Sequence, residues 1–180
     1  MARLGRLLSG ALLATALGAT ADASAQDLEN RLYLDLEAGR VVIDLRPDLA
    51  PKHVARIKEL AREGFYDGVV FHRVIPGFMA QTGDPTGTGR GGSDKPDLPA
   101  EFSNEPFERG TIGMARTSDP NSANSQFFID FVATPHLNGQ YTVVGEVVEG
   151  MEYVDQLAPG EPPASPDKIL KLQVAADAES

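Results

Sequence analysis

Two short segments of the chain place hydrogen-bond donors among bulky apolar side chains. Residues 71–81 carry Arg73 near their start and end in Gln81, with several large apolar residues between the two. Residues 125–129 begin with Ser125 and Gln126 and continue as Phe-Phe-Ile. A site of this composition can grip an apolar group while one cation acts on a neighbouring neutral bond. Chemistry of that kind requires no nucleophile.

Other motifs in the sequence give weaker indications. Residues 87–92 satisfy the string G-x-G-x-x-G, but no strand-to-helix turn of a βαβ unit surrounds them, so we expect a surface loop rather than a dinucleotide site. The histidines His53, His72 and His136 lack the spacing of zinc ligands, and neither H-E-x-x-H nor G-x-S-x-G occurs. The sequence therefore predicts no metal site and gives poor support to a hydrolase.

The first 25 residues have the pattern of a secretory signal peptide. Arg3 and Arg6 precede an apolar run at residues 7–19, and Ala-Ser-Ala at residues 23–25 fits the small-x-small cleavage rule. A membrane anchor is the alternative, but the run is about 13 residues long, against the roughly 20 needed to span a bilayer. We therefore predict a signal peptide at residues 1–25 and a single domain at residues 26–180. The expected location is the periplasm in a Gram-negative source and the medium otherwise.

The predicted mature chain is distinctly acidic. Cleavage removes two of 16 basic and one of 26 acidic residues, which leaves 14 and 25 and a net charge of −11. This balance argues against nucleic acid or an anionic membrane as a partner, because both favour clustered lysine and arginine. The absence of cysteine excludes disulfides, thiol catalysis and cysteine-bound zinc. The length suits one domain rather than two.

Many short strands and few helices are expected to position the two donor-bearing segments. Alternating apolar residues predict a hairpin of residues 32–36 and 41–45, and the spacing of Val54, Ile57 and Leu60 predicts an amphipathic helix from Pro47 to Gly64. Further short strands are predicted at residues 69–71, 78–81, 111–114, 126–129, 141–148 and 168–174, with a short helix at residues 151–157. This pattern indicates a mainly β protein with a closed or nearly closed antiparallel barrel.

Taken together, the motifs resemble those of the cyclophilins. The resemblance rests on Phe-His-Arg-Val-Ile-Pro-Gly-Phe-Met-x-Gln at residues 71–81 with Gly83 and Asp84, Gly-Met-Ala-Arg at residues 113–116, and Ser-Gln-Phe-Phe-Ile at residues 125–129. It extends over nearly the whole predicted mature chain. The resemblance implies a closed eight-stranded antiparallel β-barrel capped by two α-helices, with peptidyl-prolyl cis-trans isomerase activity on its outer face. It implies no metal and no cofactor.

The implied reaction suits the residues of the two segments. Rotation about an X-Pro bond has a barrier of about 20 kcal/mol and breaks no bond, so a donor near the prolyl nitrogen is enough to help it. Arg73 is permanently charged and presents several N–H groups in a fixed plane, and the resemblance assigns it the catalytic role of stabilising the twisted imide. The substrate-binding residues that the resemblance implies are Phe78, Met79, Gln81, Ala115, Gln126, Phe128, Leu137 and Tyr141.

The resemblance also implies which partners the protein binds, and three residues that differ from the usual cyclophilin pattern bear on its ligands. The expected partners are proline-containing segments of folding proteins, with no nucleic acid and, after signal cleavage, no membrane. His136 replaces a tryptophan that helps many relatives to bind cyclosporin, so we predict weak cyclosporin binding. Tyr141 replaces a common histidine, and Val144 in place of a common phenylalanine is expected to enlarge the pocket. We expect a monomer, because a closed barrel buries its own strand edges.

Two alternatives to an enzyme are open at this point. A folding helper could hold extended proline-containing segments without isomerising them, and a structural subunit of a larger assembly is a further possibility. A protein that only binds could lose Arg73 and Gln81 without penalty. Both residues are present, which favours the enzyme.

Overall fold

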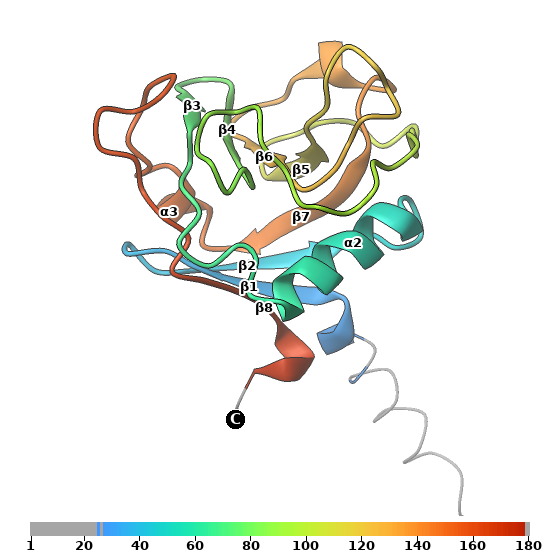
Figure 1. Ribbon diagram of the computed structural model, residues 1–180, viewed down its shortest axis with the longest axis horizontal. Helices are drawn as coiled ribbons and strands as arrows, with labels where there is room; N and C mark the ends of the chain where they lie inside the picture. The colour runs from blue at the N-terminus through green and yellow to red at the C-terminus, as the bar shows by residue number, and fades with distance from the viewer. Residues whose placement is uncertain (1–24, 26, 179–180) are drawn as a thin grey trace, which may run out of the picture.

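The protein is built on one antiparallel sheet. The computed structural model describes residue 25 and residues 27–178. Its strands are β1 (Arg31–Asp35), β2 (Arg40–Leu45), β3 (Arg73–Ile75), β4 (Met79–Thr82), β5 (Thr111–Met114), β6 (Phe127–Asp130), β7 (Val143–Glu149) and β8 (Lys171–Val174). They form an eight-stranded sheet in the order β3-β4-β6-β5-β7-β2-β1-β8. The sheet curls strongly, so that β3 and β4 lie above β1 and β8 (Figure 1). The prediction of a mainly β antiparallel fold is confirmed.

The sheet is a half-barrel, and the prediction of a closed barrel is wrong. Its edge strands β3 and β8 do not pair with each other. The gap is bridged where Val70 pairs with Lys168 in an isolated antiparallel bridge and the amide of Phe71 donates to the carbonyl of Asp167 at 2.9 Å. Residues 69–71 therefore do not form the predicted strand, because their backbone is committed to these contacts. The expected monomer stays a prediction, since its argument assumed a closed barrel.

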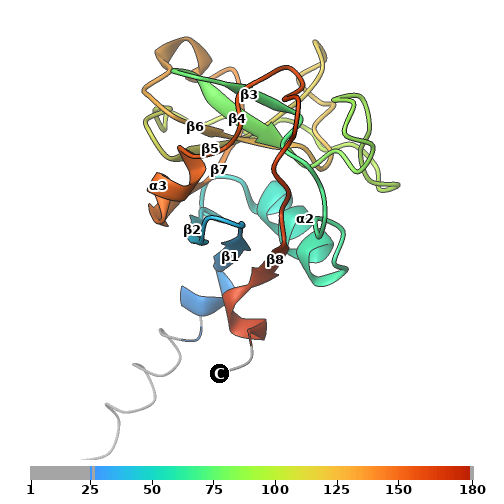
Figure 2. The same cartoon turned by 90° about the vertical axis from the view of Figure 1, so that its left-hand side faces the viewer.

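One longer helix covers the inner face of the curled sheet. Helix α2 (Pro51–Arg62) starts at a proline, whose fixed φ suits the first helical turn, four residues later than predicted. It packs Val54, Ile57 and Leu60 into the main core, which confirms the predicted amphipathic pattern. Figure 2 shows α2 beside β8 on the open side of the sheet. The second helix, α3 (Met151–Val154), is shorter than the predicted residues 151–157.

Two apolar clusters lie on opposite faces of the sheet. Along β4 and β6, Ala80 and Ile129 join the main core, whereas Met79 and Phe128 join a second cluster. The alternation follows from the pleat, which points successive side chains to opposite faces. The second cluster comprises Met79, Phe107, Phe128, Leu137 and Val143. Val144 belongs to the main core, so the expectation that it widens the pocket is wrong.

The predicted signal peptide, apart from residue 25, lies outside the described residues. Within the described part of the chain, no helix is long and apolar enough to cross a membrane.

Candidate active site

Strand register brings residues of the two sequence segments into one row. Arg73 on β3 is paired with Gln81 on β4, and Gln81 is paired in turn with Phe128 on β6. Directly paired residues of an antiparallel sheet point to the same face, so these three side chains share the outer face. Segments far apart in the chain thus place a cation, an amide and an aromatic ring side by side.

A small hollow opens beside this row. Its volume is about 140 Å³, which suits one small ring, because sites for drug-sized ligands occupy about 300–1,000 Å³. The hollow is lined by Arg73, Phe78, Met79, Gln81, Ala115, Arg116, Phe128, Leu137 and Tyr141. Every predicted site residue is therefore present except Gln126. The side chain of Gln126 lines an adjoining cavity of about 420 Å³.

Phe78 and Met79 both line the hollow although they are neighbours in the chain. Met79 opens strand β4 and is buried on the outer face in the second apolar cluster. Phe78 belongs to the tight turn before β4, in which its amide donates to the carbonyl of Ile75 at 3.0 Å and Gly77 takes a φ of +71°. The alternation of side chains in strands does not apply to this turn, so both can face the same way.

A layer of aromatic rings lies beneath the hollow, and sequence reasoning missed part of it. The rings of Phe107 and Phe128 stack with centroids 5.8 Å apart, and Tyr141 meets Phe128 edge-on at 5.7 Å. Gly113 makes the stack possible, because a Cβ atom there would come within 2.4 Å of the Phe128 ring. A glycine inside a predicted strand was the signal that another group approaches closely.

A chain of amide hydrogen bonds connects the hollow to the glycine-rich loop. Gln81 Nε2 donates to Gln126 Oε1 at 2.9 Å, and Gln126 Nε2 donates to the carbonyl oxygen of Gly91 at 2.8 Å. These bonds orient both amides along the edge of the site. They connect Gln126 to Gln81 in the wall of the hollow, although the side chain of Gln126 lines the neighbouring cavity.

The glycine-rich loop is folded around the buried carboxylate of Asp84. Backbone amides of Thr86, Thr88, Gly89 and Gly91 all donate to this side chain, at distances of 2.6–3.1 Å. Burial alone would raise the pKa of the Asp84 carboxyl, but hydrogen bonds from Thr86 and the backbone amides lower it well below its usual range. The G-x-G-x-x-G string is thus part of a loop and not of a strand-to-helix turn, which agrees with the predicted surface loop, and hydrogen bonds to Asp84 hold this loop in place.

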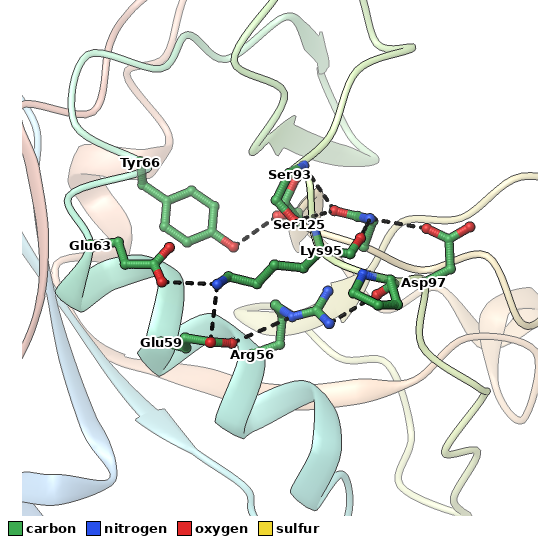
Figure 3. Close-up of polar contacts among 10 residues, drawn as sticks. Arg56, Glu59, Glu63, Tyr66, Ser93, Lys95, Asp97 and Ser125 are labelled. Carbon is green, nitrogen blue, oxygen red and sulfur yellow. Dashed lines mark hydrogen bonds and ion pairs between the residues drawn. The ribbon is translucent and has the colours of Figure 1, made fainter.

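Helix α2 holds the next part of this loop in place (Figure 3). Lys95 Nζ donates to Glu63 at 2.9 Å and to Glu59 at 3.0 Å. The carbonyl of Lys95 in turn accepts a hydrogen bond from Asn124 Nδ2 at 2.9 Å. The loop therefore links α2 to residues 124–126, which precede β6 and include Gln126.

The match to known proteins agrees with this geometry. A family model described as cyclophilin type peptidyl-prolyl cis-trans isomerase/CLD matches residues 31–174. The chain belongs to the cyclophilin family. It is a peptidyl-prolyl cis-trans isomerase, EC 5.2.1.8.

Individual relatives extend the match. A probable peptidyl-prolyl cis-trans isomerase of Brucella suis biovar 1 (strain 1330) is 57% identical over 187 residues, which cover 95% of each chain. The crystal structure of cyclophilin AquaCyp293 from Hirschia baltica has a TM-score of 0.79 at 28% identity, covering 92% of this chain and 83% of that one. A cyclophilin of Cryptosporidium parvum, crystallised in the presence of the dipeptide Ala-Pro, has a TM-score of 0.76 at 28% identity, covering 80% and 98%.

The guanidinium of Arg73 has one side-chain partner among the described residues of this cyclophilin. Its Nε donates to Glu161 Oε1 at 2.7 Å, and the side chains are 38% and 54% exposed, respectively. The two terminal nitrogens make no hydrogen bond within the described part of the chain, and Arg73 lines the hollow. Sequence reasoning missed Glu161, because it comes from residues 159–166, which gave only the signal of a surface loop.

A second cation borders the hollow. The guanidinium of Arg116 lies 4.4 Å from the centre of the Tyr141 ring, and it donates to the carbonyls of Gln140 and Thr117 at 2.7 Å and 2.9 Å. These contacts fix Arg116 against the protein, in contrast to the terminal nitrogens of Arg73. The ring of Tyr141 is thereby held between Arg116 and Phe128.

Other candidate sites in this cyclophilin carry less chemistry. His72 is buried, and burial lowers the pKa of its imidazole. A larger cavity of about 540 Å³ lies beside α2, but Lys58 and Arg62 in its wall are paired with Glu29 at 2.7 Å and 2.9 Å. Within the described residues, no cluster of histidine and carboxylate side chains could hold a metal ion.

Proposed function

We propose that Arg73 is the catalytic residue of this cyclophilin and that the hollow beside it receives the proline ring of the substrate. The observation that carries the proposal is the row of Arg73, Gln81 and Phe128 across three paired strands. The row places a cation with free N–H donors at the rim of an apolar hollow of about 140 Å³. A bound X-Pro segment with its ring in the hollow would bring the imide nitrogen to the guanidinium.

The geometry suits catalysis by stabilisation of a twisted bond. As the X-Pro bond rotates, its resonance is lost and the lone pair localises on the prolyl nitrogen. A charged donor held in place binds that nitrogen more strongly in the twisted state than in the planar one, which lowers the barrier. The Nε bond to Glu161 leaves the terminal nitrogens of Arg73 to perform this role. No proton is transferred, so no general base is required.

The remaining site residues would bind the substrate. Phe78, Met79, Phe128 and Leu137 offer apolar walls that favour burial of a ring without hydrogen-bonding groups. Gln81, Ala115, Gln126 and Tyr141 lie at the rim, where we assign them contacts with the flanking peptide. Partners would be proline-containing segments of folding proteins. The dipeptide Ala-Pro used with the Cryptosporidium parvum relative is the simplest unit with which to test this.

A protease-coupled isomerisation assay on a short Ala-Pro peptide tests the catalytic role. We expect Arg73→Ala to lower kcat/KM by two or more orders of magnitude, which corresponds to at least about 2.7 kcal/mol of transition-state stabilisation. Arg40→Ala is the matched control, because Arg40 is an exposed arginine paired with Asp35 on the β1–β2 hairpin and should have no effect. Equal activity of Arg73→Ala and the unmodified protein would refute the assignment.

The same assay separates the enzyme from a proline-binding module. If binding of the peptide, measured by calorimetry, survives while the unmodified protein does not accelerate isomerisation, the groove only holds extended segments. Acceleration that depends on Arg73 excludes that alternative.

We further propose that the protein acts outside the cytoplasm. The charged start, short apolar run and Ala-Ser-Ala of residues 1–25 support export, and newly exported chains contain X-Pro bonds that interconvert over tens of seconds without catalysis. In a Gram-negative source the destination would be the periplasm, and in another source the medium. N-terminal sequencing of protein from cell fractions tests this. Cytoplasmic protein that retains residues 1–25 would refute it.

A further inference from the structure

Arg73 forms part of the wall between two cavities. On one side lies the apolar hollow, and on the other lies a groove of about 390 Å³. The groove is lined by His72, Arg73, Gln81, Gly87, Thr88, Gly89, Glu161 and Pro162. A peptide that places its proline in the hollow and continues into this groove would pass directly over Arg73. The groove can therefore select among substrates by the residue next to the proline.

Backbone pairing positions Glu161 in the wall of this groove. The amide of Val74, on β3, donates to the carbonyl of Gly160 at 2.8 Å, and the amide of Gly160 donates back at 2.9 Å. The loop is closed at its base by the amide of Ala158, which donates to Asp167 Oδ2 at 2.7 Å. Because β3 also carries Arg73, this pairing holds Glu161 beside the guanidinium. The contact is thus a consequence of the fold.

Glu161 is the only carboxylate that lines either cavity in the described part of the chain. The charged groups that share these walls with Glu161 are Arg73 and Arg116. His72 also lines the groove, but burial lowers the pKa of its imidazole and keeps it neutral near pH 7. The ion pair uses Glu161 Oε1 and Arg73 Nε alone. The second carboxylate oxygen is left to a ligand, and at 54% exposure the side chain is accessible to one.

We propose that Glu161 is a specificity-determining residue, which favours substrates with a basic side chain beside the proline and disfavours substrates with an acidic one there. A lysine or arginine in the groove would share the carboxylate with Arg73. An acidic side chain would be repelled by Glu161 or would displace it and occupy the guanidinium needed for the twisted bond. The net charge of −11 on the predicted mature chain would steer basic segments toward the protein as well. The inference rests on the proposed role of Arg73.

Peptides that differ in one side chain test this inference. They share one sequence around the proline and carry Lys, Gln or Glu either directly before or directly after it. Isomerisation is measured by NMR exchange rather than with a protease, since a protease has its own charge preference. We expect kcat/KM to be about fivefold higher for the Lys peptide than for the Glu peptide at one of the two positions, the scale of an exposed ion pair. Added salt should reduce this ratio.

Variants assign the preference to Glu161. Glu161→Gln should bring the ratio of kcat/KM for the Lys peptide to that for the Glu peptide close to the value set by net charge alone. Glu161→Lys should make the Glu peptide the better substrate. Glu37→Gln is the matched control, because it removes the same charge from an exposed turn between β1 and β2 that borders neither cavity. It should retain the ratio of the unmodified protein. Because Glu161 is exposed, both variants are expected to fold, and thermal melting checks this.

The outcomes distinguish this inference from the proposed function. Rapid isomerisation of the Gln peptide with equal rates for Lys and Glu at both positions would overturn the inference while leaving the role of Arg73 intact. A Lys preference that Glu161→Gln leaves unchanged would also overturn it. Failure to isomerise even the Gln peptide would overturn the proposed function, and with it this inference.

Discussion

Replacement of Asp130 by asparagine should remove a pH-dependent loss of stability. Asp130 ends strand β6, where its side chain is fully buried. Thr134 Oγ1 donates to its Oδ2 at 2.6 Å, whereas Oδ1 has no hydrogen-bond partner in the described structure. Burial raises the pKa of the Asp130 carboxyl from 3.8 to about 7, and the bond from Thr134 offsets only part of this. The folded protein therefore prefers the protonated, neutral acid.

The sign and size of the effect follow from proton linkage. Between about pH 4 and pH 7 the folded state holds a proton that the unfolded chain releases, so stability falls as the pH rises through this range. A difference of about three pKa units corresponds to about 4 kcal/mol at most, of which roughly 2 to 3 kcal/mol is lost between pH 5 and pH 8. Asparagine has the same shape and cannot ionise. Between pH 5 and pH 8, Asp130→Asn should therefore become more stable relative to the unmodified protein by that roughly 2 to 3 kcal/mol.

Urea unfolding at pH 5, 6, 7 and 8 measures the difference between Asp130→Asn and the unmodified protein. Carboxyls with a lowered pKa, such as Glu101, titrate equally in both proteins and cancel from the difference. Thr134→Val adds a cross-check, because loss of its O–H donor should raise the pKa of Asp130 in the folded state further and extend the loss of stability to higher pH. A difference that stays constant from pH 5 to pH 8 would refute the reasoning.

Two further predictions concern the site. Gly113→Ala forces a methyl group against the Phe107 and Phe128 rings, which should lower the free energy of unfolding, measured with urea, by about 1–3 kcal/mol. It should also lower kcat/KM, because Phe128 would move into the hollow. Unchanged stability and activity would contradict the packing argument. Cyclosporin should bind the unmodified protein with a dissociation constant above the micromolar range. His136→Trp should lower that constant about tenfold, because an indole adds apolar area beside Phe78. An inhibition titration measures both, and full inhibition of the unmodified protein at micromolar cyclosporin would contradict the first.

The local elements and most site residues could be predicted from the sequence. The periodicity of Val54, Ile57 and Leu60 identified α2, and the alternation in residues 32–45 identified the first hairpin. These signals are local, because a side chain's position in a helix or strand repeats over a few residues. The misplaced boundaries have physical causes. Residues 69–71 are apolar enough for a strand, but their backbone bridges to residues 167–169 instead.

The closure of the sheet and the neighbours of Arg73 could not be predicted in this way. Whether β3 pairs with β8 depends on how far the sheet curls, which no short segment encodes. Arg116 lines the hollow and Phe107 stacks on Phe128 beneath it, both from positions outside the two donor-bearing segments. A strand over residues 78–81, as predicted, would point Phe78 and Met79 to opposite faces, but Phe78 lies in the turn before β4 and both residues line the hollow.

The sequence by itself determined the chemical groups of the two donor-bearing segments: a permanent cation, two amides and several apolar side chains, with no thiol among them. Only the tertiary structure decided how these groups meet. Register across β3, β4 and β6 aligns Arg73 with Gln81 and Phe128, and the pairing of Gly160 with Val74 brings Glu161 to the same guanidinium. The physical reason is that residue type sets what a side chain can do, whereas its partner depends on backbone pairing between segments distant in the chain.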